Sequence, residues 1–192
     1  MTPMSDVMTL LLCFFMLTST FLTPEPVKVN TPGSVSEVKV PENDVLNILV
    51  SPEGNIYVGS ENKNTMLEMM QTVTDKFGVS LTGEKLKHFR EDAMIGAPMA
   101  MFEAYYALDA EKMGEKIQKL SIPLDSIDGG KSEFQEWVTA ARESNPDIRL
   151  AIKADAKTSY AVIKKMMSEL QDMNENRYQL ITNLDTKKQA EI

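Results

Sequence analysis

The hydrophobic pattern of the chain begins with one short apolar stretch. Residues 7–22 are apolar or weakly polar, and Pro24 and Pro26 prevent a helix from continuing beyond them. At about 1.5 Å of rise per residue, a helix over this stretch is roughly 24 Å long, less than the roughly 30 Å of a bilayer's hydrocarbon core. We therefore expect residues 1–23 to form a transmembrane anchor that draws Asp6 towards the hydrocarbon.

Asp6 stands at the start of that stretch and has two interpretations. It can be an N-cap, because an acid before an apolar run accepts hydrogen bonds from free backbone N–H groups at the positive end of a helix. It can also be an intramembrane carboxyl, which costs roughly 2.5–3.5 kcal/mol to insert and is a functional-site hypothesis by default. Residue spacing does not separate the two.

The stretch lacks the pattern of a cleaved signal peptide. No Lys or Arg precedes Lys28, and no Ala-x-Ala site follows the apolar core. A retained single span is therefore expected. The hydroxyl groups of Thr9, Thr18 and Ser19 are able to bond across helices or back to their own backbone carbonyls.

Residues 24–44 form an extended segment in which "VKV" occurs twice. Prolines recur along it and exclude a helix. One interpretation is a plain linker. The other is a segment that adds to the edge of a sheet, either in its own chain or in a partner.

Beyond the linker the pattern predicts an α+β domain over residues 45–184, with a tail over 185–192. "VLNILVSPEGNIYVG" predicts a β-hairpin with its turn at 51–55. The elements predicted near the other end are a helix over 132–144, a strand over 148–154, a helix from Thr158 or Ser159 to about Met173, and a strand over 178–182. This order predicts a two-layer α+β sandwich.

Residues 60–131 are predicted to be a helical insertion in this domain. Thr65 is the expected cap of a first helix that stops at Gly78, and a short helix and one longer helix follow. His88 is expected at the surface, and Tyr105 and Tyr106 are expected to pack with Phe102. We expect the methionines of the insertion to be core rather than a soft partner-binding groove: Met66, Met69, Met70, Met94, Met99, Met101 and Met113.

The composition excludes several functions. The chain carries a net charge of −8, with a sequence pI near 4.8, whereas nucleic-acid binding requires a basic face. The only cysteine, Cys13, lies in the anchor, and His88 has neither a second His nor a Cys with which to hold a metal. "IDGGKS" is interpreted as a turn, and Asp155 as a strand-end acid that caps the next helix. We therefore expect no metal site, no catalytic residues and no enzyme.

Five segments resemble the ExbD/TolR family of proton-driven energy transducers: "TPMSDVMTLLLCFFMLTSTF", "VKVN", "LNILVSPEGNIYVG", "NPDIRLAIKADAKTSYAVIKKMMSELQ" and "RYQLIT". The first and fourth are the most specific. The resemblance covers roughly residues 1–60 and 130–184. Residues 60–131 have no counterpart in short members of the family. Members usually carry a short cytoplasmic tail before the proline; here either the start is recorded late or this member lacks the tail.

The resemblance implies an inner-membrane protein with a single span and a periplasmic domain. It implies that Asp6 carries protons, that the motor needs no cofactor beyond the proton gradient, and that Thr9, Thr18 and Ser19 are candidates for pore lining or packing. The implied partners are ExbB-like multi-span subunits, a second copy of the chain and a TonB- or TolA-like protein, with peptidoglycan as a further candidate and no nucleic acid. The alternative is an anchored cell-wall-binding or scaffold protein without proton coupling.

Overall fold

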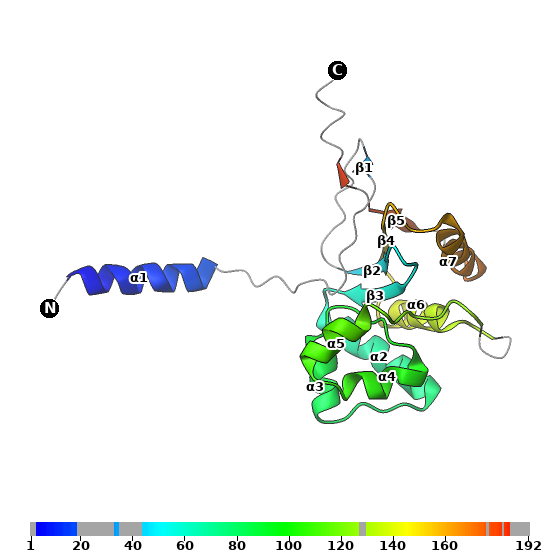
Figure 1. Ribbon diagram of the computed structural model, residues 1–192, viewed down its shortest axis with the longest axis horizontal. Helices are drawn as coiled ribbons and strands as arrows, with labels where there is room; N and C mark the ends of the chain where they lie inside the picture. Colours follow the sequence, from blue (N-terminus) through cyan, green and yellow to red (C-terminus); the bar gives the residue numbers. More distant parts are fainter. Residues whose placement is uncertain are drawn as a thin grey trace, which may run out of the picture.

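A computed structural model of the chain describes residues 3–18, 33–34, 44–126, 130–175, 177–181 and 183–184. The helices are α1 (Pro3–Thr18), α2 (Lys63–Phe77), α3 (Glu84–Glu91), α4 (Met99–Tyr106), α5 (Ala110–Ile117), α6 (Glu133–Ser144) and α7 (Tyr160–Asp172). The strands are β1 (Gly33–Ser34), β2 (Val45–Val50), β3 (Ile56–Ser60), β4 (Arg149–Ala154), β5 (Tyr178–Leu180) and β6 (Asn183–Leu184). Figure 1 shows α1 apart from the other helices, which gather around the sheet.

The predicted hairpin is confirmed and forms one end of a four-stranded sheet of order β3-β2-β4-β5. β2 and β3 are antiparallel, with Ile48 opposite Val58, while β2–β4 and β4–β5 are parallel. The turn closes through a hydrogen bond from Gly54 N to Ser51 O (2.9 Å), and Gly54 has a positive φ of 88°, which suits glycine. The last strand ends at Leu180, two residues earlier than predicted.

α6 and α7 connect the parallel strands. The predicted start of α6 is confirmed, because Ser132 and Gln135 form a reciprocal capping box. α7 begins at Tyr160, with Ser159 as a cap that makes no side-chain bond. Asp155 was expected to cap this helix, but the N-cap position is Ser159; Asp155 accepts a hydrogen bond from Lys157 N (2.8 Å), which stabilises the turn before α7.

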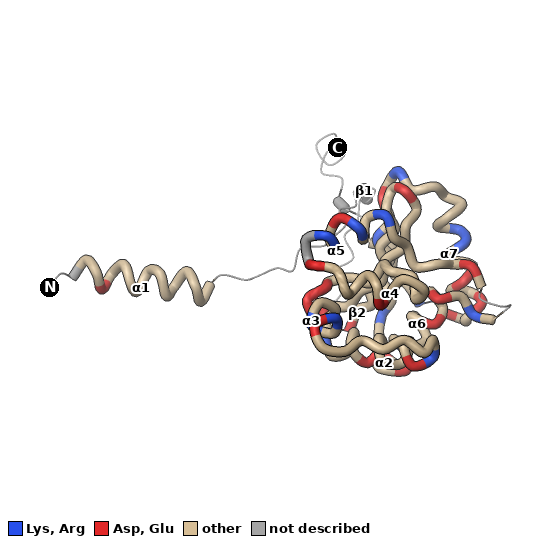
Figure 2. The backbone as a smooth tube through the Cα atoms, turned by 60° about the horizontal axis from the view of Figure 1, so that its bottom comes forward, with Lys and Arg blue, Asp and Glu red and all other residues tan. Residues whose placement is uncertain are grey.

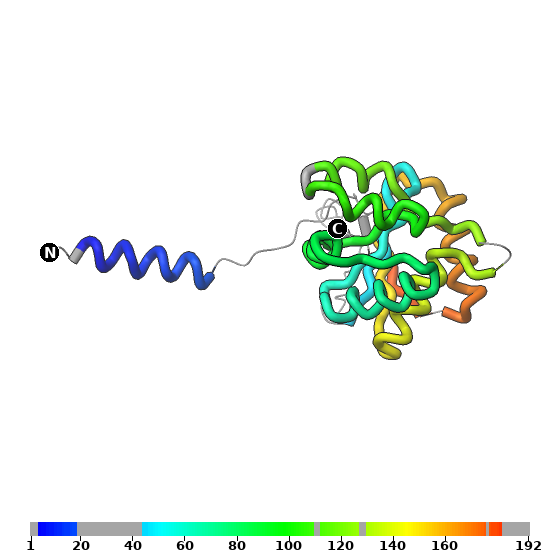
Figure 3. Tube along the Cα trace, turned by 90° about the horizontal axis from the view of Figure 1, so that it is seen from below, coloured from blue at the N-terminus to red at the C-terminus, as the bar shows by residue number. Residues whose placement is uncertain are grey.

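The fold is a mixed α+β domain with a four-stranded sheet. It differs from a simple two-layer sandwich in how the faces of the sheet are covered. Side chains of both alternating sets on β2 and β3 are buried, including Ile48 and Leu49 on successive positions. Both faces of the sheet are therefore covered at this end. Figure 3 shows the helices of residues 63–117, in teal to green, towards one end of the domain and α7, in orange, towards the other.

The predicted insertion forms α2 to α5, with two corrections to its helices. Asn62, not Thr65, is the cap of α2, and its side chain accepts bonds from the backbone N–H groups of residues 64 and 65. Gly78 ends α2 in the left-handed conformation, as predicted (φ 66°). The long helix expected after residue 98 is divided into two helices, α4 and α5. The backbone is in an extended conformation at Asp109 (ψ 150°), which separates them.

The insertion runs along the outer edge of β3. Val58 and Ile95 exchange backbone hydrogen bonds of 2.9 and 2.7 Å, and Ile122 N donates to Ile56 O at 3.0 Å. Gly59 permits this approach, since a Cβ there would lie 2.6 Å from the carbonyl oxygen of Ala93. The insertion thus covers one edge of the sheet, a relation that local sequence patterns do not reveal.

One continuous hydrophobic cluster contains residues of the sheet, of α6 and α7, and of the insertion. The methionine prediction holds for Met66, Met69, Met70, Met94, Met99 and Met113, which are buried. It is wrong for Met101, which is 40 % exposed on the outer side of α4. Phe102, Tyr105 and Tyr106 pack as predicted, with ring centroids of the last two 4.9 Å apart. His88 is half-buried, not a surface residue, because its Nδ1 lies 3.1 Å from Tyr106 O.

Candidate functional site

α1 carries the residue that the sequence singles out. Pro3 suits the first position of a helix, since its missing N–H has no partner there in any case. Asp6 follows in the first turn, where a negative charge suits the positive helix end. Figure 2 shows one acid on this helix, whereas both signs of charge are interspersed over the domain.

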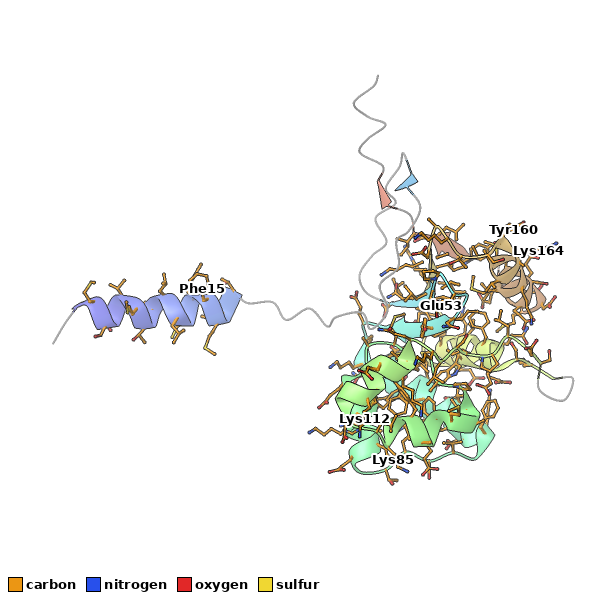
Figure 4. All side chains as sticks on the ribbon, in the orientation of Figure 1. Phe15, Glu53, Lys85, Lys112, Tyr160 and Lys164 are labelled. Atoms are coloured by element: carbon orange, nitrogen blue, oxygen red, sulfur yellow. The ribbon has the colours of Figure 1, made fainter. Side chains whose placement is uncertain are left out.

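The apolar side chains of α1 are exposed along its whole described length, from Met4 to Leu17. Figure 4 shows Phe15 projecting from the helix without a neighbouring element around it. A contiguous exposed apolar surface of this kind marks a site that another protein or a membrane covers.

α1 is a short helix. Within the described part of the chain, no helix is long and apolar enough to cross a membrane. α1 has 16 residues, and the rest of the expected 1–23 anchor, including Ser19, lies outside the described residues.

The helix brings four polar residues of α1 to one side. Thr9 lies three positions from Asp6 and four from both Ser5 and Cys13, and such spacings place side chains on the same side of a helix. We call these four residues the polar stripe. Thr18 lies twelve positions from Asp6 and is displaced from the stripe by about a third of a turn.

The threonine hydroxyls of α1 bond to their own helix. Thr9 Oγ1 donates to Ser5 O and Thr18 Oγ1 donates to Phe14 O, each at 2.8 Å. The sequence left open whether these hydroxyls bond across helices or back to their own backbone carbonyls, and the structure has the second arrangement. Each hydroxyl oxygen still has lone pairs, so Thr9 on the stripe can accept a hydrogen bond from a water or another chain.

Part of the expected linker pairs with the end of the chain. Gly33 and Ser34 form a short parallel pair, β1–β6, with Asn183 and Leu184. This pair is separate from the four-stranded sheet, and the two "VKV" stretches lie outside the described residues, so the choice between linker and sheet-adding segment stays open.

A comparison with known families shows the family of the chain. The model of the family described as biopolymer transport protein ExbD/TolR matches residues 1–185. The chain belongs to the ExbD/TolR family. Neither the curated proteins nor the solved structures contain a match to it.

Membership of the ExbD/TolR family gives the chain a general role. Members are transport-associated and in general non-enzymatic, and the family as a whole is associated with the inner membrane. ExbB/TolQ-type and TonB/TolA-type proteins are its general partners. The match also spans residues 60–131, so the family model extends across the insertion.

Other candidates from the sequence do not form a chemical site. Within the described ranges, no group of three or more His, Cys, Asp or Glu residues can hold a metal ion. Ser126 forms an antiparallel bridge with Ser132, the last residue of "IDGGKS", and residues 127–129 lie outside the described residues.

Sequence reasoning missed two carboxyls of the domain whose pKa burial raises, the half-buried Asp92 and the buried Glu133. Glu133 is buried at the start of α6, and its Oε2 accepts a hydrogen bond from Met99 N at 2.9 Å. Burial raises the pKa of Glu133, and the Met99 bond offsets part of this rise. No local pattern marks either residue, because each owes its environment to a segment distant in sequence.

Proposed function

We propose that this ExbD/TolR protein is the ExbD-like subunit of an inner-membrane proton-channel motor. In this role it couples the proton motive force to TonB-dependent or Tol-type energisation of outer-membrane transport. The observation that carries the proposal is the polar stripe: one acid, Asp6, at the head of an otherwise apolar and fully exposed helix.

Asp6 is the proposed proton carrier. Burial in a dry environment disfavours the charged form of a carboxyl, so an acid that alternates between wet and dry surroundings takes up and releases a proton. A membrane potential supplies about 2.3 kcal/mol per charge per 100 mV, comparable with the roughly 2.5–3.5 kcal/mol needed to insert the charge. Thr9 and Cys13 continue the stripe away from Asp6 and are the residues that would face the proton path.

The exposed apolar surface of α1 supports assembly with other membrane subunits. No Lys or Arg stands between Met1 and Lys28, so α1 itself offers Asp6 no cationic partner. ExbB-like multi-span subunits and a second copy of this chain supply the surroundings of Asp6. The short span is accommodated by local thinning or by drawing the first turn into the membrane.

The linker is the proposed connection between α1 and the domain. The β1–β6 pair shows one contact by which the linker engages the domain. We infer that this contact forms in one state of the motor and opens in another. Hydrogen exchange on the assembled complex should show two levels of protection around residues 33–34, whereas uniformly fast exchange in every state would reduce the segment to a tether.

Replacement of Asp6 by Asn tests the proton-carrier role. Asn keeps the size and most hydrogen bonding of Asp but cannot titrate, so Asp6→Asn should abolish energised outer-membrane uptake while leaving protein levels and co-purification with a multi-span partner unchanged. Asp6→Glu should keep some activity. The matched control is Thr18→Val, displaced from the polar stripe, which should leave uptake near normal.

The alternative function predicts the opposite result. In an anchored cell-wall-binding or scaffold protein, Asp6 would be an N-cap, and Asn caps helices about as well as Asp. Full activity of Asp6→Asn at normal protein levels would therefore overturn proton coupling. A chain that purifies alone in mild detergent would also count against the motor.

A further inference from the structure

A cavity of about 150 Å³ lies inside the insertion, between the end of α3 and α5. The α3 side supplies His88, Glu91 and Asp92, α4 supplies Tyr105, and α5 supplies Met113 together with two neighbouring residues. None of these residues belongs to α1 or to the linker, so the cavity is separate from the proposed proton path.

The polar groups that line the cavity are hydrogen-bond acceptors. Asp92 Oδ2 already accepts a bond from the hydroxyl of Tyr106 (3.3 Å) and retains further lone pairs. His88 Nδ1 lies 3.1 Å from Tyr106 O, and because a carbonyl only accepts, Nδ1 carries the proton of the neutral ring. Nε2 of His88 is then an acceptor, as are the carboxylate oxygens of Glu91.

One of these acids has a cation nearby: Lys87 Nζ lies 4.0 Å from Glu91 Oε1, and both side chains are largely exposed. No Lys or Arg lines the cavity, and no described cation forms an ion pair with Asp92. Two further cations of these helices pair elsewhere: Lys85 with Glu103 at 2.5 Å and Lys112 with Asp109 at 3.5 Å. Figure 4 shows Lys85 and Lys112 projecting outward at the rim of the insertion.

The rest of the wall is apolar and polarisable. Tyr105 and Met113 are buried, and an aromatic ring attracts a cation through its electron-rich face. A cavity of about 150 Å³ is known to hold a molecule of benzene's size, about six heavy atoms. A ligand for this space therefore combines a positive, donor-rich group with a short apolar chain. A metal ion fits less well, since the described residues offer no cluster of three ligands.

We propose that this cavity binds a small alkylammonium ion. Its ammonium group lies against the Asp92 carboxylate and donates to the free acceptors of Glu91 and His88. Its alkyl chain lies along Tyr105 and Met113. This binding site is independent of the motor function proposed above.

The titration of Asp92 gives the site a characteristic pH dependence. Burial raises the pKa of Asp92 to about 6, although hydrogen bonds from the backbone and from Tyr106 act in the opposite direction. The carboxylate is thus charged above about pH 6 and loses its charge below it. The other titratable groups facing it are His88 and Glu91 from α3 and Tyr105 and Tyr106 from α4. Loss of the Asp92 charge removes the partner of the cation, so affinity should fall at low pH.

The test is a titration of the full chain in mild detergent with n-butylammonium chloride at about pH 7.5. Calorimetry should show one saturable site with a dissociation constant of about 1 mM or tighter. In a sample with ¹³C-labelled methionine methyl groups, the resonance of Met113 should move over the same concentration range. Affinity should fall at least about tenfold when the pH is lowered to about 5, below the pKa of Asp92.

Asp92→Asn removes the charge but keeps an acceptor for Tyr106, so it should fold and lose at least about tenfold in affinity. The matched control is Asp75→Asn, which removes an exposed acid of α2 and should bind like the parent. Near-ultraviolet circular dichroism verifies that both variants are folded. Equal affinity in Asp92→Asn and the parent, or no saturable binding by the parent, would overturn the proposal.

Discussion

Methionine and phenylalanine are frequent in both α1 and the insertion, yet the two regions place them in opposite environments. Met4, Met8 and Met16 of α1 are 71 %, 70 % and 74 % exposed, whereas Met69 and Met70 of α2 are 0 % and 3 % exposed. The same residue type is therefore left open in one helix and fully packed in another.

The difference shows where each helix obtains its stability. α2 to α5 bury their apolar side chains against β3 and α6, so the chain itself completes their environment. α1 buries almost nothing within the chain, and its environment has to be supplied by lipid or by other subunits. The same substitution should therefore lower the stability of the domain when it is made in the insertion. In α1 it should instead weaken assembly with other subunits.

The largest expected effect comes from Phe102→Ala in α4. Phe102 is fully buried, and its ring contacts Phe89, Tyr106 and Trp137 at centroid distances of 6.2, 4.9 and 5.9 Å. Truncation leaves a cavity and should cost about 3–5 kcal/mol of the free energy of unfolding. Denaturant unfolding followed by Trp137 fluorescence measures the loss.

The matched control is Phe14→Ala in α1. It removes the same atoms from an exposed position, so the unfolding of the domain should be unchanged while co-purification with a membrane partner weakens. A loss of domain stability in Phe14→Ala similar to that in Phe102→Ala would mean that α1 packs on the domain, and the contrast drawn above would fail.

The sequence predicted those parts of the fold that depend on local patterns. Alternating apolar positions identified the hairpin of β2 and β3, and the spacing of Ser132 and Gln135 identified the start of α6. The family resemblance identified Asp6, and the structure adds the polar stripe, which follows from the helix period alone. These features need no knowledge of distant residues.

The features that sequence reasoning missed are set by contacts between distant segments. The bridge between Val58 and Ile95 depends on Gly59, which lets the backbone at Ala93 approach, and no hydrophobic period encodes it. The half-buried position of His88 likewise depends on the carbonyl of Tyr106, eighteen positions away. The break between α4 and α5 was missed because the apolar spacing continues across it.

The next prediction compares two acids, Asp92 in the insertion and the exposed Asp6 of α1. The folded-state pKa of Asp92 is about 6, above its ordinary value of 3.8. Between these values the folded state holds a proton that the unfolded state has released, so stability falls as the pH rises from about 4 to about 6 and is level above that. Asp92→Asn should remove this slope and gain about 2 kcal/mol at pH 7.

Urea unfolding at several pH values measures the effect of Asp92→Asn, with Asp6→Asn as the control. Asp6 is exposed on α1, so its replacement should leave the pH profile of the domain as it is in the parent. If the slope between about pH 4 and 6 persists in Asp92→Asn, another carboxyl is responsible, with Glu133 as the next candidate because its pKa is also raised by burial.

The smallest expected effect is at the start of the insertion, where Asn62 rather than Thr65 caps α2. Asn62 Oδ1 accepts hydrogen bonds from Asn64 N (3.1 Å) and Thr65 N (3.5 Å). Asn62→Ala leaves these two donors without their partner and should cost about 1 kcal/mol, whereas Asn62→Asp keeps an acceptor and should be nearly neutral. Thermal unfolding measures the difference. A stable Asn62→Ala variant would mean that water satisfies the first turn of α2, and that the helix depends on the packing of Met69 and Met70 rather than on its cap.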